Sequence, residues 1–69
     1  MKIFGERLRE MRENRAVSMC ELARRMGTSQ QNISRWEAGD TIPSAQTIVM
    51  LCAFLNVSAD FLLGLCDIA

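Results

Sequence analysis

Two short amphipathic segments that meet at a single glycine, within residues 18–39, constrain the fold of this chain most. The first segment begins at Ser18, and Glu21 follows three residues later, which is the spacing of a reciprocal capping box. Leu22 and its apolar neighbours recur on one helical face, apart from the charged residues. Gly27 ends the segment, because glycine adopts the left-handed conformation of a helix C-terminus without strain.

The second segment begins at Ser29, whose hydroxyl suits an N-cap. Ile33 and Trp36, three residues apart, are its apolar anchors, and Gly39 ends it as Gly27 ends the first. The remaining side chains are mostly polar, so this helix turns one face toward a core and the other toward solvent. Two such helices joined by a tight turn are typical of a helix-turn-helix.

Three more helices are expected around this unit, which makes the chain a compact, all-α, five-helix fold with one domain over residues 1–69. A helix of about residues 5–14 precedes the unit. Ser44 caps a fourth helix, and Ser58 caps a fifth that runs to Gly64. The apolar positions expected inside are Phe4, Leu8, Met11, Ile48, Leu51, Cys52, Leu55, Phe61, Leu62 and Leu65.

Length and charge limit the classes of partner that this chain can have. It has 69 residues and no net charge. All eight basic residues lie in residues 1–35 beside four acidic ones, while residues 36–69 hold four acidic residues and no basic one. This polarity suits a domain that turns one side toward phosphates. No apolar run approaches the roughly 18 residues of a membrane span, and no export signal is evident. We therefore expect a cytoplasmic protein without a membrane partner.

The sequence gives little support for metal, redox or catalytic chemistry. Cys20, Cys52 and Cys66 lack metal-ligand spacing, and the chain has no histidine. We expect Cys20 and Cys52 to be buried as small apolar side chains and Cys66 to be the exposed one. Without histidine or tyrosine, no local motif assembles a nucleophile, a base and an orienting group. We predict no enzyme, no metal, no cofactor and no small-molecule ligand.

The stretch ELARRMGTSQQNISRWEAG, followed by IPSAQTIVMLCAFLNVSADFLLG, resembles the phage-repressor and Cro-like helix-turn-helix family, also called the xenobiotic-response-element class. The resemblance covers roughly residues 4–65, with the glycine turn, the capping serines, Trp36-Glu37 and Pro43-Ser44 in the family's order. It implies a lambda-repressor-like DNA-binding domain with its helix-turn-helix over about residues 18–39. It also implies a transcriptional regulator, most simply a repressor, that binds a palindromic operator on double-stranded DNA as a homodimer.

The recognition helix of such a protein, here about residues 29–38, enters the major groove with its N-terminal residues against base edges. Glutamine amides at its start pair with adenine N6 and N7, and a guanidinium one turn later reaches guanine or a phosphate. The residues expected at bases are Gln30, Gln31, Ser34 and Arg35. The alternative for these four is the solvated face of a surface helix.

Phosphate contacts are expected from hydroxyls, amides and the N-terminal ends of two helices. The positions are Ser18, Met19, Thr28, Ser29, Asn32 and Thr41. Met19 departs from the family, many members of which carry a glutamine there. The loop Asp40-Thr41-Ile42 is not basic, which predicts fewer neutralised phosphates and a weaker dependence of affinity on salt.

The resemblance also implies an internal salt bridge between Arg12 and Glu37, which joins the first helix to the recognition helix. The alternative is two unrelated surface charges. Apolar residues that the core does not need are expected to form a dimer surface on the fourth and fifth helices. These residues are Met50, Phe54, Leu63 and Ile68. Alternatively, some of them fold back onto the core or cover a further domain.

A second class of function stays open, namely a protein-interaction module of the same fold. Such a module would use its apolar C-terminal face on a partner protein, as an antitoxin-like or anti-repressor partner does. The Gln30-Gln31 pair favours DNA binding, whereas the Asp40 loop and the zero net charge leave the interaction module open.

Overall fold

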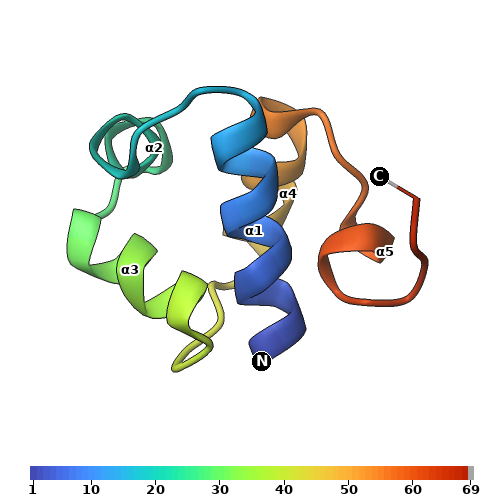
Figure 1. The fold of residues 1–69 in the computed structure, drawn as a ribbon. Coiled ribbons are helices and arrows are strands. Elements are labelled where there is room, and N and C mark those ends of the chain that lie inside the picture. The colour runs from blue at the N-terminus through green and yellow to red at the C-terminus, as the bar shows by residue number, and fades with distance from the viewer. Residues whose placement is uncertain (69) are drawn as a thin grey trace.

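A computed structural model of the chain describes residues 1–68 (Figure 1). Its helices are α1 (Lys2–Asn14), α2 (Met19–Met26), α3 (Gln30–Ala38), α4 (Ala45–Leu55) and α5 (Ala59–Leu62). No β-strand occurs in these residues, so the prediction of a five-helix, all-α fold is confirmed. None of the described helices has the length and apolar character needed to cross a membrane.

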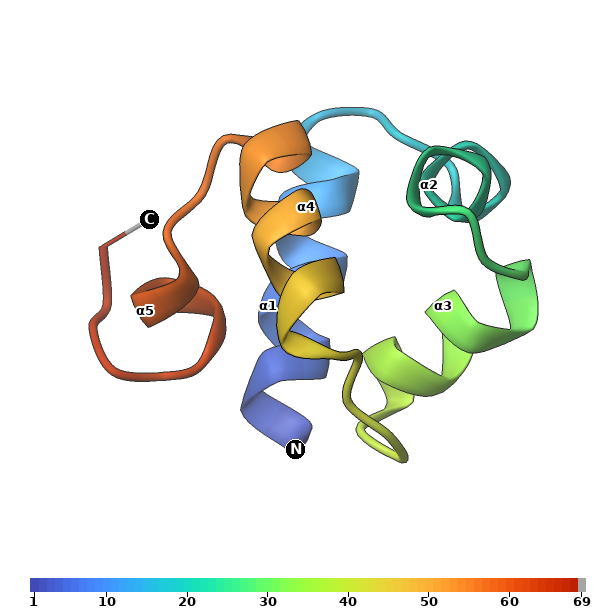
Figure 2. The ribbon, with the colours of Figure 1, turned by 180° about the vertical axis from the view of Figure 1, so that it is seen from behind.

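The first helix, α1, lies at the centre of the arrangement. One side of α1 faces α2 and α3, and the other side faces α5 (Figure 1). The reverse view shows that α4 lies behind α1 (Figure 2). One hydrophobic core joins the five helices, and its fully buried side chains are Phe4, Leu8, Leu22, Ile33, Leu51, Leu55 and Leu62. In this arrangement α1 contacts both the predicted recognition helix and the C-terminal segment.

Serine caps begin four of the helices, as the sequence predicts. In each case the serine hydroxyl accepts a hydrogen bond from the backbone N–H three residues further on. These caps are Ser18, Ser29, Ser44 and Ser58. Gly27 and Gly39 follow α2 and α3 with φ angles of 68° and 85°, so both adopt the left-handed conformation. The serine caps and glycine stops predicted for α2 and α3 are therefore present.

Two other helix limits differ from the prediction. The first helix begins at Lys2 rather than at about residue 5, and the last ends at Leu62 rather than at Gly64. Beyond Leu62 the chain closes with a hydrogen bond from the Leu65 N–H to the Asp60 carbonyl, across Gly64 at a φ of 85°. The turn at residues 63–65 therefore closes α5 and does not continue it as a helix.

Close packing of α1 on α3 depends on Gly5. A β-carbon at this position would overlap the backbone carbonyl oxygens of Trp36 and Glu37 and lie 2.8 Å from the carbonyl carbon of Glu37. Because those atoms belong to the backbone of α3, the whole helix would have to shift away from α1 to make room. Glycine at position 5 therefore sets how closely the predicted recognition helix approaches α1.

The burial of three side chains differs from the prediction. Cys66, expected to be exposed, is half-buried and packs against the hydrophobic core. Cys20 is exposed, because it lies on the opposite side of α2 from the buried Leu22. Leu65 is 75% exposed, because it follows the turn at Gly64 and points away from the core. Cys52 is half-buried, and desolvation raises the pKa of its thiol above the ordinary value.

Candidate nucleic-acid interface

The α3 helix has one buried face and one open face. Ile33 is fully buried, and Trp36 is almost completely covered. The four residues predicted at bases are all exposed, and they are Gln30, Gln31, Ser34 and Arg35. Two amides, a hydroxyl and a guanidinium offer the donors and acceptors that match base edges in the major groove. The fold therefore leaves this whole set available on one side of one helix.

Most phosphate-contact candidates gather at the N-terminal ends of α2 and α3. The Oγ atoms of Ser18 and Ser29 accept backbone hydrogen bonds at 3.0 Å and 3.2 Å, and each hydroxyl keeps a proton to donate. The Asn32 Nδ2 donates to the Thr28 Oγ1 at 2.7 Å, so these two side chains hold one another in place. Thr41 lies apart from them, exposed in the loop after α3.

The side chain of Met19, at the start of α2, packs inward. Its side chain is half-buried and packs against the hydrophobic core, and a thioether has no proton to donate. A phosphate at this position would meet only the backbone N–H at the start of α2. Met19 therefore stays a predicted phosphate contact through its backbone N–H alone.

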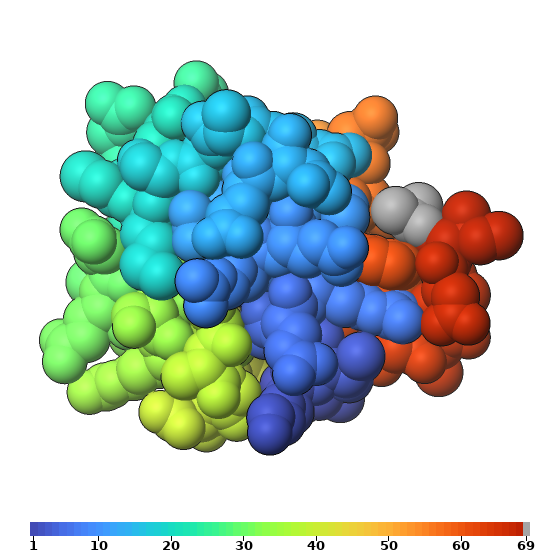
Figure 3. Space-filling view, viewed as in Figure 1, coloured from blue at the N-terminus to red at the C-terminus, as the bar shows by residue number. Residues whose placement is uncertain are grey.

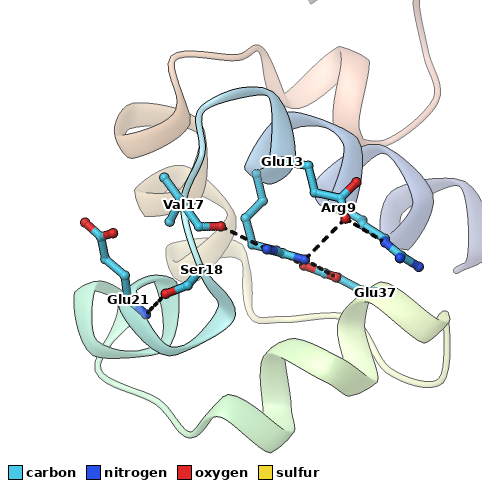
Figure 4. Close-up of polar contacts among 7 residues, drawn as sticks. Arg9, Glu13, Val17, Ser18, Glu21 and Glu37 are labelled. Atoms are coloured by element: carbon cyan, nitrogen blue, oxygen red, sulfur yellow. Dashed lines mark hydrogen bonds and ion pairs between the residues drawn. The ribbon is translucent and has the colours of Figure 1, made fainter.

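The predicted salt bridge between Arg12 and Glu37 is present. Arg12 donates from Nε to Oε2 of Glu37 at 2.6 Å and from Nη2 to Oε1 at 3.2 Å, and its Nη1 donates to the Val17 carbonyl at 2.9 Å (Figure 4). The side chains of Arg12 and Glu37 are only 10% and 4% exposed. The hydrogen bonds that Arg12 donates to the Glu37 carboxylate raise the pKa of Arg12, so the cation persists. This pair fixes α3 against α1.

Part of the basic half of the chain is engaged in contacts within the fold. Arg7 and Arg12 are engaged inside the fold, and Arg9 pairs with Glu13 at 3.2 Å along α1. The Arg25 guanidinium lies 5.2 Å from the centroid of the Phe54 ring. Only part of the basic half is therefore free to meet phosphates.

The four residues predicted for the dimer surface fall into two groups. Met50 and Ile68 are exposed, as expected. Phe54 and Leu63 are half-buried and pack against the core, so the expectation that they lie on the surface is wrong. Phe54 is covered because it lies beneath Arg25 of α2.

Three features of the structure have little signal in the sequence. The anchoring of the C-terminal segment by Arg7 involves backbone carbonyls more than 50 residues away, which no local pattern reveals. Gly5 lies within a helix, where glycine lowers stability. A glycine at such a position indicates that another element packs closely there. Val49 belongs to the exposed apolar residues of α4, and the prediction did not include it. Residues 1–68 hold no cluster of three or more candidate metal ligands.

Comparison with known proteins identifies the family of this fold. A family model described as Helix-turn-helix matches residues 8–62. The SPbeta prophage-derived uncharacterized HTH-type transcriptional regulator YonR of Bacillus subtilis is 36% identical over 61 residues, which cover 88% of this chain and 56% of YonR. This chain thus spans about half the length of that relative.

Two solved structures have a similar fold. The P22 c2 repressor protein in complex with a synthetic operator has a TM-score of 0.82 and 31% identity, with 90% of this chain and 94% of that chain covered. The biofilm regulator SinR in complex with DNA has a TM-score of 0.78 and 31% identity, with 87% and 97% covered. The chain belongs to the phage-repressor-like helix-turn-helix family.

Proposed function

We propose that this chain is a sequence-specific DNA-binding domain that regulates transcription, as a repressor, by placing α3 in the major groove. The observation that carries the proposal is the open polar face of α3, with Gln30 and Gln31 in its first turn. On its other face, α3 is anchored to the core by the buried Trp36 and to α1 by the ion pair between Glu37 and Arg12. A rigid helix keeps its side chains in register with base edges.

The surroundings of α3 support the same use. The backbone N–H groups at the starts of α2 and α3 and the hydroxyls of Ser18, Ser29 and Thr28 supply phosphate donors on both sides of the turn. Asn32 orients Thr28, and Thr41 adds a donor after α3. The two solved relatives that are bound to DNA support this role by similarity.

We further propose that the chain acts as a homodimer on a palindromic operator. One recognition helix meets only a few base pairs, and two-fold pairing places two such helices about 34 Å apart on one face of the duplex. Exposed apolar side chains on α4 and after α5 supply a surface for this pairing. These side chains are Val49, Met50, Leu65 and Ile68.

The experiment that tests this function is selection of bound duplexes from a random-sequence library, followed by fluorescence anisotropy at one stated salt concentration. We expect an enriched inverted repeat, bound at least about 1,000-fold more tightly than a scrambled duplex. No enrichment, together with equal affinity for the two duplexes, contradicts the proposal.

A second candidate function is a protein-interaction module of the same fold. The observation that favours it is the same set of exposed apolar residues, together with Ile42 in the loop after α3. In that case, Gln30→Glu and Gln31→Glu leave partner binding intact, whereas DNA binding is weak and independent of sequence.

A further inference from the structure

One arginine of α1, Arg7, reaches the segment that follows α5. Its Nη1 donates to the carbonyl oxygens of Phe61 and Cys66, each at 2.6 Å, and its Nη2 contacts the Asp67 Oδ1 at 3.1 Å. The guanidinium also lies 4.3 Å from the centroid of the Phe61 ring. The Arg7 side chain is only 16% exposed, so most of these contacts are shielded from water.

The segment of residues 63–68 has few other anchors. The helix before it, α5, is four residues long, and the backbone N–H groups of Leu63, Gly64 and Leu65 bond only within residues 59–65. Among the described residues, residues 63–68 form hydrogen bonds to only one helix besides α5. That helix is α1, and Arg7 donates all of these bonds. The space-filling view shows this segment, in red, against α1, in blue (Figure 3).

The apolar side chains of this segment point in two directions. Leu63 and Cys66 pack against the hydrophobic core, while Leu65 and Ile68 are 75% and 83% exposed. Exposed side chains gain most from burial against a partner when their backbone is already ordered, because ordering costs conformational entropy. The Arg7 contacts join this backbone to α1 within one copy of the chain.

We propose that Arg7 is a positioning residue for self-association, which orders residues 63–68 so that Leu65 and Ile68 contact a second copy of the chain. This inference rests on the homodimer of the proposed function. A second copy is the fitting occupant because the segment lies on the opposite side of α1 from α3 (Figure 1), so pairing there leaves α3 free for DNA. Residues 36–69 hold no basic side chain, so this surface does not itself suit phosphates.

The test compares wild type, Arg7→Met and Arg9→Met by sedimentation equilibrium without DNA. Arg7→Met keeps most of the apolar stem and removes the donors, and we expect it to raise the dimer Kd by about tenfold or more. Arg9→Met is the matched control, because Arg9 lies exposed on the same helix and pairs only with Glu13, and we expect its Kd to be unchanged.

Two further measurements separate positioning from general loss of structure. In Arg7→Met, the ¹⁵N relaxation of residues 63–68 should report new backbone motion while α1 to α4 keep the wild-type values. In a Leu65→Ser background, Arg7→Met should change the dimer Kd much less than in wild type, because both act through the same contact. Arg7→Lys keeps the charge without the guanidinium fork and should weaken the dimer less than Arg7→Met.

The outcomes are distinguishable. A wild-type dimer whose Kd is unchanged by Arg7→Met, although residues 63–68 become mobile, overturns the positioning role and leaves the DNA-binding proposal standing. A wild-type chain that stays monomeric both free and on an inverted-repeat duplex overturns the dimer and this inference with it. In that case, enrichment of one DNA sequence by the monomer would still support the DNA-binding proposal.

Discussion

The guanidinium of Arg12 and the carboxylate of Glu37 form a two-point ion pair between α1 and α3, and both side chains are at least nine-tenths buried. Glu37→Ala would leave the Arg12 cation without its partner in a site that water barely reaches. We expect the free energy of unfolding to fall by about 3–5 kcal/mol, measured by urea denaturation.

The matched control for this prediction is Glu13→Ala. Glu13 also lies near Arg12, at 4.0 Å from Nη2, but its side chain is exposed. Because exposed ion pairs add little, this change should cost no more than about 0.5 kcal/mol. Equal effects of Glu37→Ala and Glu13→Ala would mean that burial of the Arg12 pair does not matter.

The close approach of α1 and α3 predicts that Gly5→Ala is harmful, although alanine is the better helix former. The added methyl group meets the backbone carbonyls of Trp36 and Glu37. We expect a net loss of about 1–3 kcal/mol in the free energy of unfolding, after the gain in helix propensity is included. An unchanged or higher Tm of Gly5→Ala would show that α3 can move away freely.

The cysteines should differ in reactivity. Cys20 is exposed, whereas burial raises the pKa of the Cys52 thiol and lowers its fraction of reactive thiolate. Iodoacetamide at pH 8, followed by mass spectrometry, should therefore modify Cys20 before Cys52 in the folded protein. Urea-unfolded protein is the control, in which the two should react alike. Faster modification of Cys52 in the folded chain contradicts the structure.

The raised pKa of Cys52 also makes the free energy of unfolding depend on pH. In the folded chain the thiol keeps its proton to a higher pH than in the unfolded chain, so its contribution is fully present below the unfolded value. That contribution is lost as the pH rises from about 9 through the folded pKa. Cys52→Ser should flatten the alkaline fall in the free energy of unfolding, measured by urea denaturation.

A homodimer sets the spacing of the operator. Two recognition helices related by two-fold symmetry fit half-sites that are about 10 base pairs apart, centre to centre. Insertion of about 5 base pairs between selected half-sites turns one of them to the far side of the duplex and should reduce binding to that of a single half-site. Equal affinity before and after the insertion is the result that opposes a rigid dimer.

Local features of the fold could be predicted from the sequence because their causes are local. A serine cap and a glycine stop act within one helical turn, so the limits of α2 and α3 followed from Ser18, Gly27, Ser29 and Gly39. The buried stripe around Leu51 likewise follows from periodicity.

The remaining features depend on partners far away in the sequence. Whether Phe54 is covered depends on Arg25, and whether residues 63–68 are ordered depends on Arg7. No spacing pattern in the sequence predicts those contacts. For the candidate site, the exposure of Gln30 and Gln31 followed from helix periodicity, whereas the inward packing of Met19 depends on how α2 meets the core.

The most direct test of the account is the affinity of Gln30→Ala and Gln31→Ala for the selected duplex and for a scrambled one, by fluorescence anisotropy at one salt concentration. Gln46→Ala, an exposed glutamine at the start of α4, is the control. If α3 reads bases, each variant loses about 1–3 kcal/mol on the selected duplex and almost nothing on the scrambled one, and Gln46→Ala loses nothing on either. Equal losses on the two duplexes, or none, would contradict recognition of bases by α3.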